Sequence, residues 1–336
     1  MRSIWIGFAL ATVALGQTVA QVERRLEIKN APTDQAFMEM ANGIRTLMEI
    51  RDLSANAAQR AITMHATADQ VAGAEWLAQQ LDQPIGNAGS SSDQFKMDEA
   101  GPKGPPIQDV VRVFNFKNPA NVQEFVEIAN GIRTVTETRR LFTYNANMAM
   151  MIRDTPDKAA AIEWLVGQLD KPANQPKDSD GGGYSGLTDK LGDTPTRVFY
   201  IKTAKNPQEL INIANAVRST AQIRRLFTVN AQRAIILRDY PDTVATVEWL
   251  LNQLDQPPAQ TPSSEEYRLP GATDESVRVF HLASADLLQQ FKSGAAEAIG
   301  SGGIFVFDTP RVVMLRGNTS QLAVATQLIN DLQAQH

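Results

Sequence analysis

The chain has 336 residues, 43% of them apolar and 21% charged, which is a globular composition but too long for one compact core at about 100 to 200 residues per domain. Its 32 basic and 37 acidic residues give a net charge of −5, which argues against bulk nucleic-acid binding through an excess of lysine and arginine. It contains no cysteine, which excludes disulfides, thiolate zinc sites and cysteine nucleophiles.

The chain begins with the pattern of a signal peptide. Arg2 precedes an apolar run from Ile4 to Leu15, which is shorter than the roughly 20 residues that span a bilayer. Cleavage after Gly16 or after Ala20 fits the small residues that follow, and we favour the second, with residues 1–20 as the signal peptide. We therefore expect an exported protein, periplasmic or associated with the outer membrane, without a membrane span in the mature chain. The alternative is a buried helix at the edge of a domain.

An internal repeat organises the rest of the sequence. The motif Asn-Gly-Ile-Arg-Thr starts at Asn42 and again at Asn130, and a looser copy starts at Asn215. Glu-Trp-Leu and Leu-Asp-x-Pro recur at identical spacing, so the copies are ungapped. The predicted modules are 24–84, 112–172 and 197–257, followed by a diverged fourth module at 278–333 that lacks the tryptophan.

The segments between the modules differ in composition. They are rich in glycine, serine, proline and aspartate, which is typical of flexible linkers. The predicted linkers are 85–111, 173–196 and 258–277.

Each module has the periodicities of a βαββα unit. In the second, residues 112–116 alternate as a strand, and Asn118-Pro119 predicts a cap and a first helical proline. Two strands follow around an asparagine-rich turn, and Thr155-Pro156 opens a second helix. The expected fold class is α+β: four tandem βαββα modules, each a small sheet with two helices on one face. The other face and at least one edge strand of each sheet should stay open.

These motifs resemble the periplasmic N-terminal domains of secretins, the ring-forming outer-membrane channels of type II secretion and type IV pilus systems. The resemblance rests on Arg-Val-Phe at Arg112, Arg197 and Arg278, on the paired strands, and on the closing Leu-Asp-x-Pro. It implies a KH-like module that packs side by side into rings, contacts secretion partners and carries no catalysis. Residue 336 ends a repeat helix, so the secretin β-barrel is not expected here. The turn before the last strand also lacks the Thr-Asn usual in the family.

Two sets of repeated residues are candidates for special roles. Each tryptophan of the Glu-Trp-Leu motifs lies one position from an inward leucine, which favours core packing over a ligand platform. Paired arginines enter a strand in two modules, where they could bind an acidic partner or be simple solvated strand ends. The expected core aromatics are Trp76, Trp164 and Trp249, and the interaction candidates are Arg139, Arg140, Arg224 and Arg225.

Patterns for metals, nucleic acid and catalysis are weak. The segment from Asp178 to Gly183 begins like a calcium loop but lacks its third carboxylate and terminal glutamate. Gly300–Gly303 has the form of a KH loop without basic neighbours. The sequence has no His-Glu-x-x-His, Gly-x-Ser-x-Gly or P-loop motif. We expect no enzyme activity, cofactor, metal or nucleic acid.

The leading functional hypothesis is a non-enzymatic exported scaffold that mediates assembly or partner binding in the cell envelope, beside a secretin or pilus machine. Its partners would be proteins, including a secretin, a pilus component or other copies of itself. The alternative is a soluble periplasmic capture protein that binds peptides or cell-wall glycans, and a hydrolase is a distant third. Light scattering after size exclusion separates the first two, because defined oligomers or co-elution with a secretin ring favour assembly.

Overall fold

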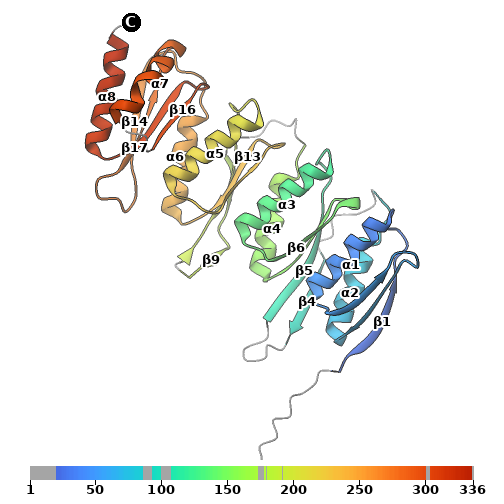
Figure 1. Cartoon of the computed structure of the whole chain (residues 1–336). Helices are drawn as coiled ribbons and strands as arrows, with labels where there is room; N and C mark the ends of the chain where they lie inside the picture. Colours follow the sequence, from blue (N-terminus) through green and yellow to red (C-terminus); the bar gives the residue numbers. More distant parts are fainter. Residues whose placement is uncertain are drawn as a thin grey trace, which may run out of the picture.

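The computed structural model describes residues 20–85, 93–99, 107–172, 178, 180–190, 192–299 and 303–334. Within these residues, pairs of helices pack on small antiparallel sheets, which confirms the predicted α+β class (Figure 1). We call each sheet of three or four strands, together with its helix pair, a unit. The predicted module boundaries stay predictions, and the predicted signal peptide, apart from Ala20, lies outside the described residues.

The first two units lie in the N-terminal half of the chain. Unit 1 consists of β1 (Val22–Glu27), α1 (Asp34–Met48), β2 (Asp52–Asn56), β3 (Ala61–Ala66) and α2 (Ala68–Leu81). Unit 2 consists of β4 (Gln94–Glu99), β5 (Ile107–Asn115), α3 (Val122–Thr136), β6 (Arg140–Tyr144), the 3-10 turn η1 (Asn145–Asn147), β7 (Ala149–Asp154) and α4 (Pro156–Leu169).

The other two units follow the same order. Unit 3 consists of β8 (Asp180–Tyr184), β11 (Thr196–Tyr200), α5 (Pro207–Ala221), β12 (Leu226–Val229), β13 (Ala234–Arg238) and α6 (Pro241–Leu254), with a two-stranded ribbon of β9 (Thr188–Asp189) and β10 (Gly192–Asp193). Unit 4 consists of β14 (Ser263–Arg268), β15 (Ser276–His281), α7 (Ala285–Ile299), β16 (Ile304–Phe307), β17 (Val312–Gly317) and α8 (Thr319–Ala334).

Parts of the predicted linkers are strands. The sheet of unit 1 has the order β1-β3-β2, whereas units 2 to 4 add β4, β8 and β14 at the edge beside their first strand. The prediction that 85–111, 173–196 and 258–277 are only flexible linkers is therefore wrong for these segments. The physical reason is the unpaired edge of β5, β11 and β15, whose backbone groups pair with even a polar or glycine-rich segment. The calcium-like segment thus contributes β8.

The first helix of unit 2 starts later than predicted. The N-cap is Asn121 and not the predicted Asn118. The side chain of Asn121 accepts from the backbone N–H of Glu124. Asn118 instead donates its side-chain amide to the carbonyl of Asp170, and its own N–H to the Asp170 carboxylate. In unit 3 an Asn-Pro pair does open the first helix, with Asn206 as the cap and Pro207 in the first turn.

The aspartate of Leu-Asp-x-Pro fastens the end of the second helix to the loop after the first strand. Asp170 accepts from the N–H groups of Lys117 and Asn118, at 3.1 and 2.8 Å. Asp82 and Asp255 make the equivalent pair of bonds in units 1 and 3. This contact explains why the motif repeats: the carboxylate satisfies two backbone donors at once.

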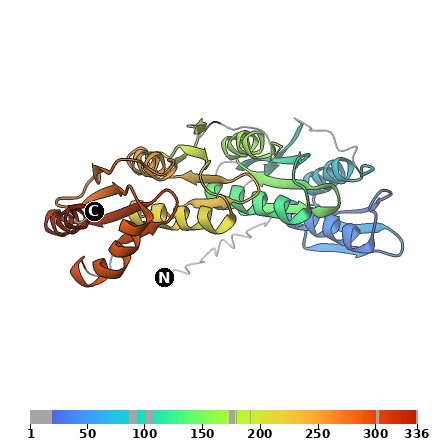
Figure 2. The same ribbon diagram turned by 90° about the horizontal axis from the view of Figure 1, so that it is seen from above.

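Each of the first three helix pairs packs between its own sheet and the sheet of the next unit. The core around α1 and α2 contains Ile62 and Met64 of their own sheet together with Val113 and Met151 of unit 2. The cores around α3 and α4 and around α5 and α6 combine neighbouring units in the same way. Sheets and helices alternate along an elongated molecule, with β1 at one end and α8 at the other (Figure 1 and Figure 2). The sheet face expected to stay open is covered in units 2 to 4.

Candidate interaction surfaces at the unit junctions

The first helix of one unit lies directly against the edge strand of the next. In α1, a Cβ added to Gly43 would lie 2.9 Å from Met151 Cε and 3.2 Å from a ring atom of Phe142. In α3, a Cβ added to Gly131 would meet Ile236 and Phe227 in the same way, both at 2.9 Å. The glycine of Asn-Gly-Ile-Arg-Thr thus lets the next sheet approach the helix closely. That contact outweighs the roughly 1 kcal/mol by which glycine weakens a helix interior.

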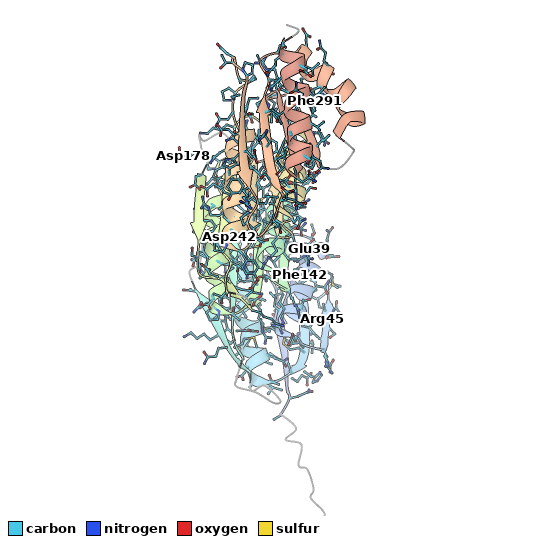
Figure 3. All side chains as sticks on the ribbon, turned by 90° about the vertical axis from the view of Figure 1, so that its left-hand side faces the viewer. Glu39, Arg45, Phe142, Asp178, Asp242 and Phe291 are labelled. Carbon is cyan, nitrogen blue, oxygen red and sulfur yellow. The ribbon has the colours of Figure 1, made fainter. Side chains whose placement is uncertain are left out.

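A glutamate on the same helix face holds the turn of the next unit. Glu39 accepts from the backbone N–H of Asn145 at 3.1 Å and from its side-chain amide at 3.3 Å. Figure 3 labels Glu39 beside Phe142 at this junction. Glu127 binds Asn230 through the same two donors at the second junction. Burial raises the pKa of Glu127, and the bonds from Asn230 act against that rise.

An arginine–acid cluster closes the first junction. Glu49, which caps α1 in a left-handed conformation, pairs with Arg140 of β6 at 2.8 Å. Buried Asp109 of β5 accepts from Arg140 at 2.9 Å and from Arg153 at 3.1 Å. Arg153 is 1% exposed and also donates to the carbonyl of Leu47 at the end of α1. The guanidinium groups thus meet the negative end of the helix dipole of α1.

The second junction repeats the cluster with looser spacing. Glu137 caps α3 and lies 3.5 Å from Arg225 and 3.8 Å from Arg238. Asp189 pairs with Arg225 at 3.4 Å, and Thr194 accepts from Arg238. Burial lowers the pKa of Arg238, and the neighbouring Arg225 lowers it further.

The third junction is less charged. Gln222 caps α5 where the earlier units have glutamate. Arg316, at the position of Arg153 and Arg238, donates to the carbonyl of Thr220 at 2.9 Å and pairs with Glu275.

The four arginine candidates divide into two pairs. Arg140 and Arg225 make ion pairs with the C-terminal end of the first helix of the preceding unit, so both guanidinium groups have partners within this chain. Arg139 and Arg224 are exposed at the start of the same edge strands. The cluster acids were missed by sequence reasoning, although Glu49 and Glu137 follow the same repeat spacing as the motifs.

The three tryptophans also lie at junctions. Each is half-buried at the border of a hydrophobic core, not inside it. Each ring contacts an aromatic ring on the strand that the next unit adds: Trp76 with Phe95 at 6.1 Å between centroids, Trp164 with Tyr184 at 6.1 Å and Trp249 with Tyr267 at 5.1 Å. The tryptophans therefore do not pack only within their own unit. Each partner ring lies on a strand within a segment that the sequence predicts to be a linker.

Two histidines lie in different surroundings. His281 in β15 is 7% exposed, and its Nε2 lies 3.0 Å from Gln253 of unit 3. Burial lowers the pKa of His281. His65 lies on an exposed sheet face, 3.0 Å from Asp52. Among the described residues, no group of three histidine, aspartate or glutamate side chains could hold a metal ion.

The outer face of the unit 1 sheet differs from the covered faces. Arg25, Thr63 and Ser54 form its central row, on the side opposite to buried Ile62 and Met64. The equivalent rows of units 2, 3 and 4 are apolar: Val113, Met151 and Phe142; Val198, Ile236 and Phe227; and Val279, Met314 and Phe305.

No known protein-family profile and no curated protein matches the chain. Among solved structures it is similar to Aeromonas hydrophila ExeD, with 13% identity over 89% of this chain and 59% of that one, and a TM-score of 0.17. It is also similar to the N-terminal domain of the secretin XcpQ from Pseudomonas aeruginosa. That match covers 70% of this chain and 100% of the XcpQ domain, with 13% identity and a TM-score of 0.24.

A third similar structure is the ETEC pilotin–secretin AspS–GspD complex, with 12% identity over 93% of this chain and 54% of that one, and a TM-score of 0.17. The chain thus spans little more than half the length of ExeD and of the chain matched in this complex. In the part of the chain that the structure describes, no helix is long and apolar enough to cross a membrane.

Proposed function

We propose that this protein is a non-enzymatic, exported scaffold that mediates assembly or partner binding in the cell envelope, in a type II secretion or type IV pilus-like context. The envelope context rests on the signal-peptide pattern and on the sequence resemblance to secretin N-terminal domains. The scaffold role is supported chiefly by one observation, the repetition of the same Glu–Asn and Glu–Arg contacts at two successive junctions.

Repeated junctions give each unit a defined orientation to the next, as in other linear repeat proteins. Equivalent surfaces then recur at regular intervals along the stack. Arg51, Arg139 and Arg224 occupy equivalent exposed positions before β2, β6 and β12. A row of exposed guanidinium groups attracts an acidic partner and orients it, although each group adds little affinity alone.

Size exclusion with light scattering on envelope extracts tests this proposal. We expect the protein to co-elute with a secretin or pilus component, and Arg139→Glu with Arg224→Glu to weaken that co-elution, more so at low salt. The matched control is Lys117→Glu with Lys202→Glu, which reverses the same charge at exposed sites of the same two units. Equal loss in both double variants, or no co-elution at all, would refute the scaffold.

The junction grooves keep the capture alternative open. A groove of about 640 Å³ lies between units 2 and 3, bordered by Glu124, Glu127, Phe227 and Asn230. Its volume is within the range of about 300 to 1,000 Å³ usual for ligand sites. A monomer whose melting temperature rises with short peptides or cell-wall glycans, and that associates with no envelope protein, would favour this function.

A further inference from the structure

Units 1 to 3 protect one edge of their sheets with an arginine from their own first helix. The guanidinium donates to a backbone carbonyl of the edge strand, which a strand from another molecule would otherwise bind. The pairs are Arg45 with Leu53 at 2.7 Å, Arg133 with Leu141 at 2.5 Å and Arg218 with Leu226 at 2.8 Å. This protection explains the arginine of the Asn-Gly-Ile-Arg-Thr repeat.

Unit 4 lacks that arginine. Counted from the first residue of each helix, the three arginines are twelfth in α1, α3 and α5, and the twelfth residue of α7 is Ala296. The arginine pair before the edge strand is also absent. Strand pairing aligns Ile304 with Leu226, so the sequence has Gly302 and Gly303 in place of Arg224 and Arg225.

The direction of the free backbone groups of β16 follows from one hydrogen bond. The carbonyl of Gly303 accepts from the N–H of Arg316 in β17 at 3.0 Å. Because successive residues of an antiparallel strand face opposite neighbours, Ile304 and Val306 direct their N–H and C=O groups away from β17. β16 is the last strand of its sheet, so these groups form its open edge.

The side chains of β16 are apolar on both faces. Ile304 and Val306 pack at the border of the unit 4 core, and Phe305 packs at the border of the core shared with unit 3. All three are half-buried. Antiparallel pairing of two copies of β16 therefore brings no charged side chain into the interface, whereas β2 and β6 include Asp52 and Arg140.

We propose that β16 pairs antiparallel with β16 of a second copy of this chain. With Phe305 opposite Phe305 of the second copy, Ile304 lies opposite Val306 of that copy and Val306 opposite its Ile304. These two pairs are the outward-facing ones, so each exchanges two N–H···O bonds. The two copies keep their helices on the same side of one continuous sheet. The inference goes beyond the proposed scaffold and does not depend on it, since a monomer could bind a secretion partner equally well.

Sedimentation velocity across a dilution series of the full chain tests this pairing. We expect a reversible dimer, and we expect Ala296→Arg, which restores the protecting arginine of the other units, to raise its dissociation constant by at least about tenfold. Ala323→Arg is the matched control, because it adds the same charge at an exposed site of α8. Circular dichroism and melting verify that both variants fold.

Amide hydrogen exchange on the unmodified chain gives a second readout. Protection of Ile304 and Val306 should rise with protein concentration, while Phe305, whose N–H faces β17, should not change. A chain that stays monomeric, or a dimer that Ala296→Arg and Ala323→Arg weaken equally, would overturn the inference. Protection of Ile304 and Val306 that appears only on adding an extended apolar peptide would also overturn it, and would assign the edge to a partner strand.

Discussion

Removal of Asp109 tests whether the arginine–acid cluster holds the first two units together. Asp109 is 4% exposed and is the shared acceptor for Arg140 and Arg153. Removing one partner of a buried ion pair costs about 3 to 5 kcal/mol, because the remaining charge is left without a counter-charge. Arg140 is one-third exposed and keeps Glu49, and Arg153 keeps the carbonyl of Leu47. We therefore expect Asp109→Ala to lower the free energy of unfolding by about 3 kcal/mol, at the low end of that range.

Urea unfolding followed by circular dichroism measures this cost, with the slope m compared between variants. Asp52→Ala is the control, because the Asp52 side chain is 73% exposed and its loss should cost under about 0.5 kcal/mol. Arg153→Met combined with Asp109→Ala should cost clearly less than the sum of the single changes, since neither charge is then buried alone. Additive costs, or equal costs for Asp109→Ala and Asp52→Ala, would refute the reasoning.

Three further predictions follow from the junctions. Trp164→Ala should cost about 2 kcal/mol in urea unfolding, below the 3 to 5 kcal/mol of a fully buried aromatic, because the ring is half-buried against Tyr184. The pKa of His281 is lowered in the folded chain, so the unfolded chain binds a proton at this residue at a higher pH than the folded chain does. The free energy of unfolding should therefore decline as the pH falls below about 6.5. His281→Gln should flatten that decline in urea titrations. Limited proteolysis with mass spectrometry should find Gly182 and Ser263 resistant, because both lie in paired strands, and an early cut at either would contradict those strands.

The regular elements are predictable because the repeat supplies the same local signals several times. Apolar residues at helical spacing, such as Phe125, Ile128 and Ile132, are all buried as the periodicity requires. Thr155-Pro156 opens α4 as predicted. Asn118-Pro119 fails as a cap because Asn118 is bonded to Asp170 from the far end of the unit, a contact that no local pattern reveals.

The junctions are harder to predict because their two sides belong to different repeats. Met97 lies in a segment whose composition is typical of a linker, yet it is fully buried in the core of unit 1. Alternation along β6 puts Phe142 and Arg140 on one face, but it gives no indication that α1 covers this face. The repeat spacing of Glu49 and Glu137 was the available signal, and only the structure pairs them with arginines.

The two ends of the stack lack the groups that hold the inner junctions. Docking a further helix pair on the outer face of unit 1 would bury Arg25, at the position where the inner junctions have valine. An apolar helix face carries no acid that could offset the cost of desolvating this arginine. At the other end, Gln327 of α8 is equivalent to Trp249 of unit 3. The equivalence follows from the preceding residues: Arg278 binds Thr326 in unit 4, and the equivalent Arg197 pairs with Glu248 in unit 3. Stacking end to end would thus lose the aromatic contact on one side and desolvate an arginine on the other. Within the described residues, the edges of β2, β6 and β12 each accept from an arginine of the first helix and the edge of β16 does not, which favours the β16 edge for the proposed association of whole chains.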